Sequence, residues 1–197
     1  MSEPVHQLRA RQALQERVSA AIVEAAARVL AERREQASMT DVATAAGVAR
    51  ATVYRYFPSR EALLTRVAEV AVADAGARLA SARISEIAPD EGVTRAVRAL
   101  ADVGDPFIVF ARERVRPERR HLDDAIAAPL QQLFERGQAA GAFRTDVSPS
   151  WLAETFLALI ASVLAVSPNM GREDTTAAIT SLFLDGARAR REPDRRR

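Results

Sequence analysis

The sequence predicts an all-α fold with a small N-terminal domain of three helices and a larger C-terminal helical domain. Apolar residues recur at the three- and four-residue spacing of amphipathic helices, as in Val18, Ile22, Ala25 and Val29. Glycine and proline residues divide the chain into segments of helix length. We find no segment with the alternation of polar and apolar residues that indicates a strand.

The composition is typical of a soluble globular protein and excludes several classes of function. The 197 residues are 48% hydrophobic and 27% charged, and they include no cysteine. This excludes disulfides, thiolate metal sites, iron–sulfur clusters and a cysteine nucleophile. His6 lies in the N-terminal tail, and His121 has only Asp123 and Asp124 beside it, so we expect no metal site, no cofactor and no enzymatic activity.

The expected location is the cytoplasm. The first residues, MSEPVHQLRARQALQER, are charged where a signal peptide would be apolar. No apolar run reaches the roughly 18 residues of a membrane span. We therefore expect no membrane partner.

Four parts follow from these patterns. Residues 1–17 are expected to form a mobile arm, 18–64 the N-terminal domain, 65–187 the C-terminal domain and 188–197 a basic tail. The tail, RARREPDRRR, contains six arginines and two acids. We expect it to be solvated, as charged chain ends usually are, although it can also add non-specific affinity for DNA.

Helix boundaries in the N-terminal domain follow from capping and breaking residues. The first helix is expected over residues 18–34. The second begins at Thr40, whose hydroxyl caps it, with Asp41 at the positive end of the helix dipole, and it ends at Gly47. The third runs over residues 50–57.

A long fourth helix is expected to link the two domains, with Ser59 as its cap and Gly76 as a bend. Later breaks are expected to cut the remainder into about five helical segments. These breaks are at residues 89–92, 104–106, 117, 141–149 and 167–173. Pro129 should kink the helix over residues 121–140 or divide it into two.

The segment that follows the first helix has the spacing of a helix-turn-helix, in which one short helix braces a second that enters the major groove of DNA. The close crossing of the two helices needs a small residue, Ala43, and a turn former, Gly47. The apolar residues that pack the pair are Val42, Ala46, Val48 and Val53. The outward face of the third helix offers Arg50, Thr52, Tyr54, Arg55 and Tyr56. Residues 42–60 carry arginines and no acid, which favours contact with phosphate.

Residues 18–64 resemble the DNA-binding domain of the TetR family of regulators. The match centres on TDVATAAGVARATVYRYFPSREALL, which has fixed spacing over three elements. The resemblance implies that Thr40 meets phosphate, that Arg50, Thr52 and Tyr54 enter the groove, and that Tyr56 and Arg60 hold the DNA backbone. Three residues depart from the common pattern: Ala49 replaces a capping serine, Tyr56 a histidine and Arg60 a lysine.

Residues 147–166, VSPSWLAETFLALIASVLAV, are apolar on nearly every face, which favours a partner surface. In the TetR family the last two helices pair with their twins in a four-helix bundle, which implies a two-fold dimer that sets two recognition helices about 34 Å apart. The residues expected at this interface are Phe156, Leu159, Ile160, Val163, Ile179, Leu182 and Phe183.

The resemblance also implies a pocket for an unknown small-molecule effector among the middle helices. The apolar residues that can line it are Leu100, Phe107, Phe110, Leu130, Leu133, Phe134, Trp151 and Phe156, although the same residues also fit an ordinary core. The predicted function is that of a ligand-responsive repressor released from a near-palindromic operator. The alternative is a small-molecule-binding protein whose helix-turn-helix is only a scaffold, and operator binding discriminates between the two.

Overall fold

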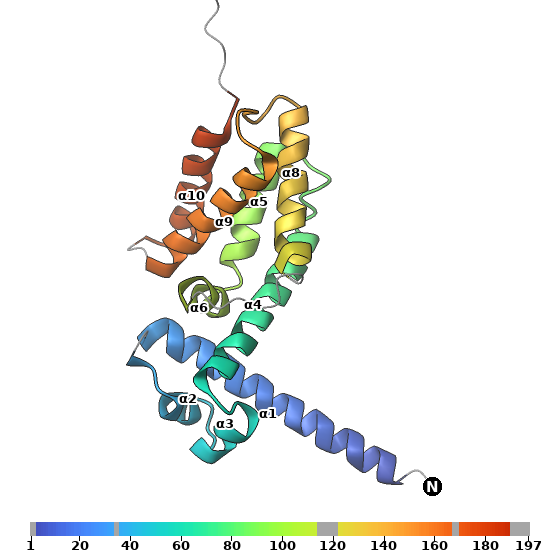
Figure 1. Cartoon of the computed structure of the whole chain (residues 1–197), viewed down its shortest axis with the longest axis vertical. Helices are drawn as coiled ribbons and strands as arrows, with labels where there is room; N and C mark the ends of the chain where they lie inside the picture. Colours follow the sequence, from blue (N-terminus) through green and yellow to red (C-terminus); the bar gives the residue numbers. More distant parts are fainter. Residues whose placement is uncertain (1–2, 34–35, 114–121, 167–169, 190–197) are drawn as a thin grey trace, which may run out of the picture.

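The N-terminal domain consists of three helices and the start of a fourth. The structure, a computed structural model, describes residues 3–33, 36–113, 122–166 and 170–189. The first four helices are α1 (Glu3–Arg33), α2 (Met39–Ala45), α3 (Arg50–Tyr56) and α4 (Arg60–Ser81). Helices α2 and α3 lie together at one end of the molecule, and α4 rises from them into the C-terminal domain (Figure 1).

The C-terminal domain is a bundle around the second half of α4. Its elements are α5 (Pro89–Ala101), α6 (Asp105–Glu113), a π-helix η2 (Asp123–Ala127), α8 (Ala128–Ala139), α9 (Pro149–Val166) and α10 (Arg172–Ala187). Helix α6 lies across the junction between the two domains, below α9 and α10 (Figure 1). The residues described contain one isolated β-bridge, Phe143 to Arg188, and no strand. The all-α prediction is confirmed.

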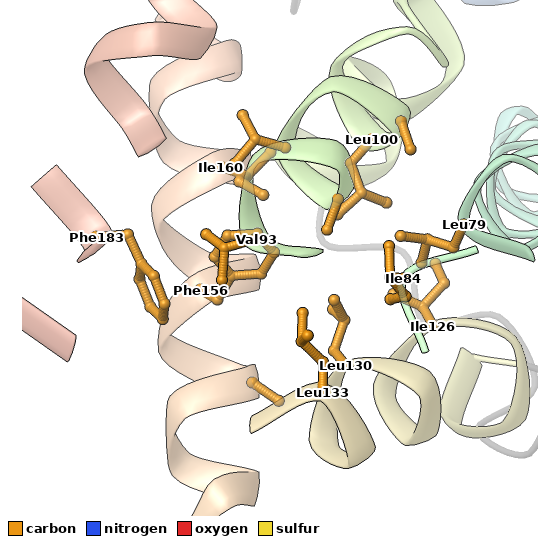
Figure 2. Close-up of a cluster of buried hydrophobic side chains, with 14 of the residues drawn as sticks. Leu79, Ile84, Val93, Leu100, Ile126, Leu130, Leu133, Phe156, Ile160 and Phe183 are labelled. Atoms are coloured by element: carbon orange, nitrogen blue, oxygen red, sulfur yellow. The ribbon is translucent and has the colours of Figure 1, made fainter. Parts of the chain in front are cut away.

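Two hydrophobic cores divide the molecule, and α4 and α6 contribute to both. In α4, Leu63 and Val67 are buried in the N-terminal core, whereas Leu79 is buried in the C-terminal core. In α6, Val109 belongs to the first core and Phe107 to the second. Figure 2 shows the C-terminal core, where side chains from α4, α5, η2, α8, α9 and α10 converge.

The first helix is longer than expected. It begins at Glu3, so the prediction that the first helix starts at residue 18 is wrong. Residues 8–17 contain alanine, leucine, glutamine, glutamate and arginine, all of which favour a helix. Pro4 is tolerated because it stands in the first turn, where its missing N–H has no helical partner.

Two glycines expected as breaks lie inside helices. Gly76 is within α4, and a Cβ there would be 2.8 Å from the Cβ of Ala125. Gly92 is within α5, which begins at Pro89, and its Cβ would be 2.5 Å from Cδ1 of Leu133. Close helix packing rather than a bend therefore accounts for both glycines.

The segment around Pro129 differs from a single kinked helix. The π-helix η2 precedes α8, and Pro129 stands in the first turn of α8. Proline lacks the N–H that would continue the regular ladder, so a wider turn before it is a natural solution. The predicted break at Pro117 and the residue His121 lie outside the described residues.

Helix α9 is the described helix that most resembles a membrane span. This 18-residue helix has a mean hydropathy of 1.7, so by length and composition it could cross a membrane. It packs against α6, α8 and α10 in the folded protein, as a core helix does. Only 22% of its residues are buried, however, so much of this apolar helix faces outward.

Candidate DNA-binding site

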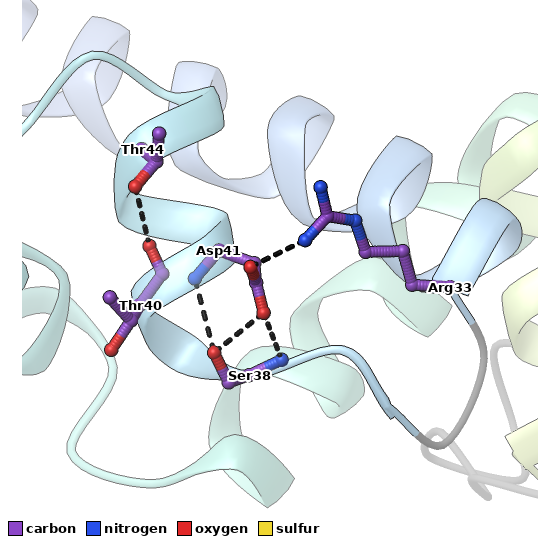
Figure 3. A network of polar contacts seen from close by, with 5 residues as sticks. All are labelled: Arg33, Ser38, Thr40, Asp41 and Thr44. Carbon is purple, nitrogen blue, oxygen red and sulfur yellow. Dashed lines mark hydrogen bonds and ion pairs between the residues drawn. The ribbon is translucent and has the colours of Figure 1, made fainter.

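The start of α2 is fixed by a capping box (Figure 3). The Ser38 hydroxyl accepts a hydrogen bond from the Asp41 N–H at 3.2 Å, and the Asp41 carboxylate accepts from the Ser38 N–H at 2.9 Å. Arg33 at the end of α1 donates to the same carboxylate at 2.6 Å. The side-chain and backbone hydrogen bonds from Ser38, and then Arg33, hold the pKa of Asp41 below its ordinary value.

The sequence predicts Thr40 as the cap of α2, and this prediction is wrong because Ser38 is the cap. Its backbone carbonyl accepts a hydrogen bond from the Thr44 hydroxyl at 3.0 Å, and Thr40 itself is exposed. The S-x-x-D spacing of Ser38 and Asp41 is the signal that could have identified the true cap. The exposed Thr40 remains a predicted phosphate contact.

The turn between α2 and α3 depends on Gly47, which has a φ of 67°. This left-handed conformation is strained for other residues, so glycine is required here. The Val48 N–H donates to the Ala43 carbonyl at 3.0 Å and closes the end of α2. Ala43 and Val53 are 3% and 0% exposed, so the two helices meet at the positions the motif predicts.

Helix α3 presents a basic and aromatic outer face. Its cap, Ala49, makes no side-chain hydrogen bond, as the departure from the serine pattern implies. The Arg50 guanidinium lies 5.3 Å from the centre of the Tyr54 ring, with Nη2 3.5 Å from the Tyr54 hydroxyl. The Arg55 guanidinium lies 5.3 Å from the centre of the Tyr56 ring. These rings hold two flexible arginines at the surface that the motif assigns to DNA.

The exposure of the side chains along α3 agrees with a helix that contacts DNA through one face. Arg50, Tyr54 and Arg55 are exposed, and Thr52 and Tyr56 are half-buried. Val53, on the opposite side, is in the core. The structure thus brings these five predicted residues together on one short helix with no acid in its sequence.

Arg60 at the start of α4 has a partner that sequence reasoning missed. Ser59 caps α4 by accepting a hydrogen bond from the Ala62 N–H at 3.1 Å, as predicted. The Arg60 guanidinium donates to the Glu113 carboxylate of α6 at 3.2 Å. The two residues are 53 positions apart, so no local pattern could have indicated the pair.

The neighbour of Glu113 ties α6 to two further helices. Arg112 donates to the Ala31 carbonyl of α1 at 3.2 Å and to the Ala165 carbonyl of α9 at 3.0 Å. At the other end of α6, burial, and then Glu32 of α1, raise the pKa of Asp105. Helix α6 is therefore a second connection between the two domains, beside the continuous helix α4.

The residues predicted to line an effector pocket lie mainly in the C-terminal core. Six are at most 2% exposed: Leu100, Phe107, Leu130, Leu133, Phe134 and Phe156. Phe110 is half-buried against this core, and Trp151 is 50% exposed on α9. Three hollows lie at the surface: one of about 370 Å³ between α5 and α10, one of about 560 Å³ between α4 and α5, and one of about 460 Å³ between α4 and α8. None of the three is lined by any of these eight residues.

The predicted dimer residues divide into two groups. Phe156, Ile160, Ile179 and Phe183 are at most 6% exposed within one chain, where they belong to the C-terminal core, and their part in a dimer interface stays a prediction. Leu159 and Val163 are half-buried, and Leu182 is 66% exposed. The helical spacing had indicated apolar positions without indicating which face of each helix turns inward.

Comparison with known proteins identifies relatives of this chain. A sequence profile described as "Bacterial regulatory proteins, tetR family" matches residues 22–67. The HTH-type transcriptional repressor LfrR of Mycolicibacterium smegmatis is 30% identical over 176 residues, which cover 87% of this chain and 90% of the relative.

Solved structures agree over most of the chain. The crystal structure of LfrR from Mycobacterium smegmatis in complex with proflavine has a TM-score of 0.71 at 27% identity, covering 88% of this chain and 97% of that one. AibR in complex with isovaleryl coenzyme A and operator DNA shares the fold, with a TM-score of 0.66 at 23% identity, covering 84% and 97%. Relatives thus bind operator DNA and small-molecule effectors. This chain belongs to the TetR family of bacterial regulatory proteins and is a helix-turn-helix transcriptional repressor rather than an enzyme.

Proposed function

We propose that this repressor binds a near-palindromic operator as a two-fold dimer and leaves it when a small molecule binds the C-terminal domain. The observation that carries this proposal is the outer face of α3, where Arg50, Tyr54 and Arg55 are exposed and no acid is present. A helix of this kind can enter the major groove, with Arg50, Thr52 and Tyr54 in the groove and Tyr56 at the DNA backbone. Its target lies in the cytoplasm, where bacterial DNA is.

The outward faces of α9 and α10 support the dimer. Trp151 and Val166 on α9 are 50% and 72% exposed, and Leu182 on α10 is 66% exposed. The two helices lie side by side on one flank of the C-terminal domain (Figure 1). Exposed large apolar side chains on two adjacent helices favour burial against a second copy.

The operator is tested by selection from random duplex DNA with the purified protein, followed by footprinting of the recovered sequence. We expect two protected half-sites about one helical turn apart. Tyr54→Ala should weaken binding of the recovered duplex about tenfold or more, with little change in thermal stability, because Tyr54 is exposed and lies outside both hydrophobic cores. Recovery of no sequence above competitor DNA would favour the alternative in which the helix-turn-helix is a scaffold.

The dimer is tested by light scattering after gel filtration. Leu182→Glu should yield a monomer, because a carboxylate would be buried at the contact. The control is Glu135→Gln on α8, which lies away from the α9–α10 face and should remain dimeric. A Leu182→Glu protein of wild-type mass would contradict this interface.

The effector is tested with proflavine, the ligand of the related LfrR structure. Proflavine fluorescence should change on binding to this chain, and the compound should release the selected operator. Binding of dye without release of DNA would contradict its action as an effector.

A further inference from the structure

The ion pair between Arg60 and Glu113 joins a predicted DNA contact to the C-terminal domain. Arg60 is at the first position of α4, directly after the helix-turn-helix, and Glu113 is in the last described turn of α6. The side chains are 39% and 17% exposed, so the carboxylate is shielded but the guanidinium still reaches solvent. A cation in this position can be shared between an internal carboxylate and an external phosphate.

Helix α6 has physical reasons to hold this carboxylate in place. The Glu113 side chain is only 17% exposed, and a largely buried carboxylate gains from a neighbouring cation. Arg112 anchors the same end of α6 to the carbonyls of Ala31 and Ala165. The position of Glu113 therefore depends on contacts with α1 and α9.

The other arginines in and beside the helix-turn-helix, Arg33, Arg50 and Arg55, have a different environment from that of Arg60. Within the described residues, Arg50 and Arg55 lie against tyrosine rings, which leave their positive charge uncompensated. Arg33 pairs with Asp41 at the start of α2, so the negative charge of Asp41 is compensated before it can act on the arginines of α3. Arg60 is distinct because its charge is already paired with a carboxylate.

We propose that Glu113 competes with a DNA phosphate for Arg60, so that α6 in its present position lowers operator affinity. The inference rests on the proposed operator binding and adds to it an internal competitor. An effector that holds α6 in this position keeps Arg60 paired and weakens the complex with DNA. A shift of α6 that withdraws Glu113 frees Arg60 and strengthens the complex.

Glu113→Gln is the variant that tests this competition, because glutamine keeps the size of the side chain and removes its charge. The probe is the duplex that the wild-type protein selects from random DNA, and binding is measured by fluorescence anisotropy at about 0.1 M salt. We expect Glu113→Gln to bind this duplex about fivefold more tightly than wild type, the upper range for a partly exposed ion pair. Glu113→Asp, which keeps the charge but shortens the side chain, should fall between the two.

Two controls separate the local pair from general charge effects. Glu91→Gln makes the same change of charge on α5, where Glu91 pairs with exposed Arg95, and should change affinity by less than about twofold. In an Arg60→Gln background, Glu113→Gln should bring no further tightening than Glu91→Gln, because the contested cation is gone. Circular dichroism melting checks that each variant is folded.

The outcomes distinguish this inference from the proposed function. If wild type selects a duplex and Glu113→Gln tightens binding only when Arg60 is present, the competition is supported. If wild type selects a duplex but Glu113→Gln behaves like Glu91→Gln, or tightens binding without Arg60, the competition is overturned and operator binding stands. If wild type selects no duplex, operator binding is overturned and the competition with it.

Discussion

The two hydrophobic cores of this protein are built from different side chains. The N-terminal core consists of alanine, valine, leucine, isoleucine and methionine, with Phe57 as its buried phenylalanine among the described residues. The C-terminal core is centred on aromatic rings: Phe134 lies 5.4 to 5.8 Å, between ring centres, from Phe143, Phe156 and Phe183. Small side chains allow the short helices α2 and α3 to cross closely, whereas large rings fill the wider space between long helices.

This difference shows how stability and function are distributed. The helix-turn-helix depends on a capping residue, Ser38, and a turn residue, Gly47, because α2 and α3 are short. The C-terminal domain depends on a few large buried side chains. Helix α6 connects the two cores, because Val109 lies in the N-terminal core and Phe107 in the C-terminal core. A change in the packing of one core can therefore reach the other through this helix.

The largest expected effect is that of Phe134→Ala. Phe134 is 0% exposed and contacts three other rings, so the substitution should lower the free energy of unfolding by about 3–5 kcal/mol. Val53→Ala, equally buried in the N-terminal core, should cost about 2 kcal/mol, because it removes two methyl groups. Urea denaturation followed by circular dichroism measures both. Equal costs would contradict the stronger role of the aromatic core.

A pair of glycines tests the packing of the C-terminal domain at a smaller scale. An added Cβ at Gly137 would be 2.1 Å from the Phe143 ring, so Gly137→Ala should lower stability by about 1–3 kcal/mol. At Gly186 on α10 an added Cβ meets nothing within 4 Å, so Gly186→Ala should raise stability by about 0.5–1 kcal/mol through helix propensity. Thermal melting compares the two variants with wild type. Opposite signs are expected, and a shared sign would refute the packing argument.

The helix-turn-helix could be predicted from the sequence because its determinants are local. Ala43, Gly47, Val53 and Ser59 stand at fixed spacing, and the structure places each where the motif requires it. The cap of α2 was misplaced by two residues, although the S-x-x-D pattern at Ser38 indicates it. Local patterns are sufficient here because the elements are short and adjacent in the chain.

The C-terminal domain was predictable as helical but not in its surfaces. Phe156 and Ile160 follow the same apolar periodicity as Leu159 and Val163, yet the first pair is buried in one chain and the second is not. Because α9 is apolar on most faces, periodicity cannot choose the inward side. The Arg60–Glu113 pair joins residues far apart in the sequence, and only the packing of α6 on α4 brings them together.

The cap of α3 offers a test on the reading domain. Ala49 makes no side-chain hydrogen bond, so Ala49→Ser should raise the free energy of unfolding by about 0.5–2 kcal/mol by satisfying an N–H at the start of α3. Ala51→Ser, at an exposed position inside α3, is the matched control and should give no gain, because serine there has no cap to form. Urea denaturation distinguishes the two. A gain in both variants would mean that capping is not its cause.

The smallest expected effect is a pH dependence at the start of α2. Hydrogen bonds from Ser38 and the charge of Arg33 hold the pKa of Asp41 below its ordinary value of 3.8. A carboxyl with a lowered folded-state pKa contributes stability that is present above its unfolded-state pKa and is lost as the pH falls through the folded-state pKa. Wild type should therefore be more stable than Asp41→Asn at pH 7, and the difference should shrink as the pH falls below about 4. Asp185→Asn on α10, far from the capping box, controls for the general loss of a negative charge. If the difference in stability between wild type and Asp41→Asn stayed constant down to pH 2, the ionised carboxylate would not be what stabilises the cap.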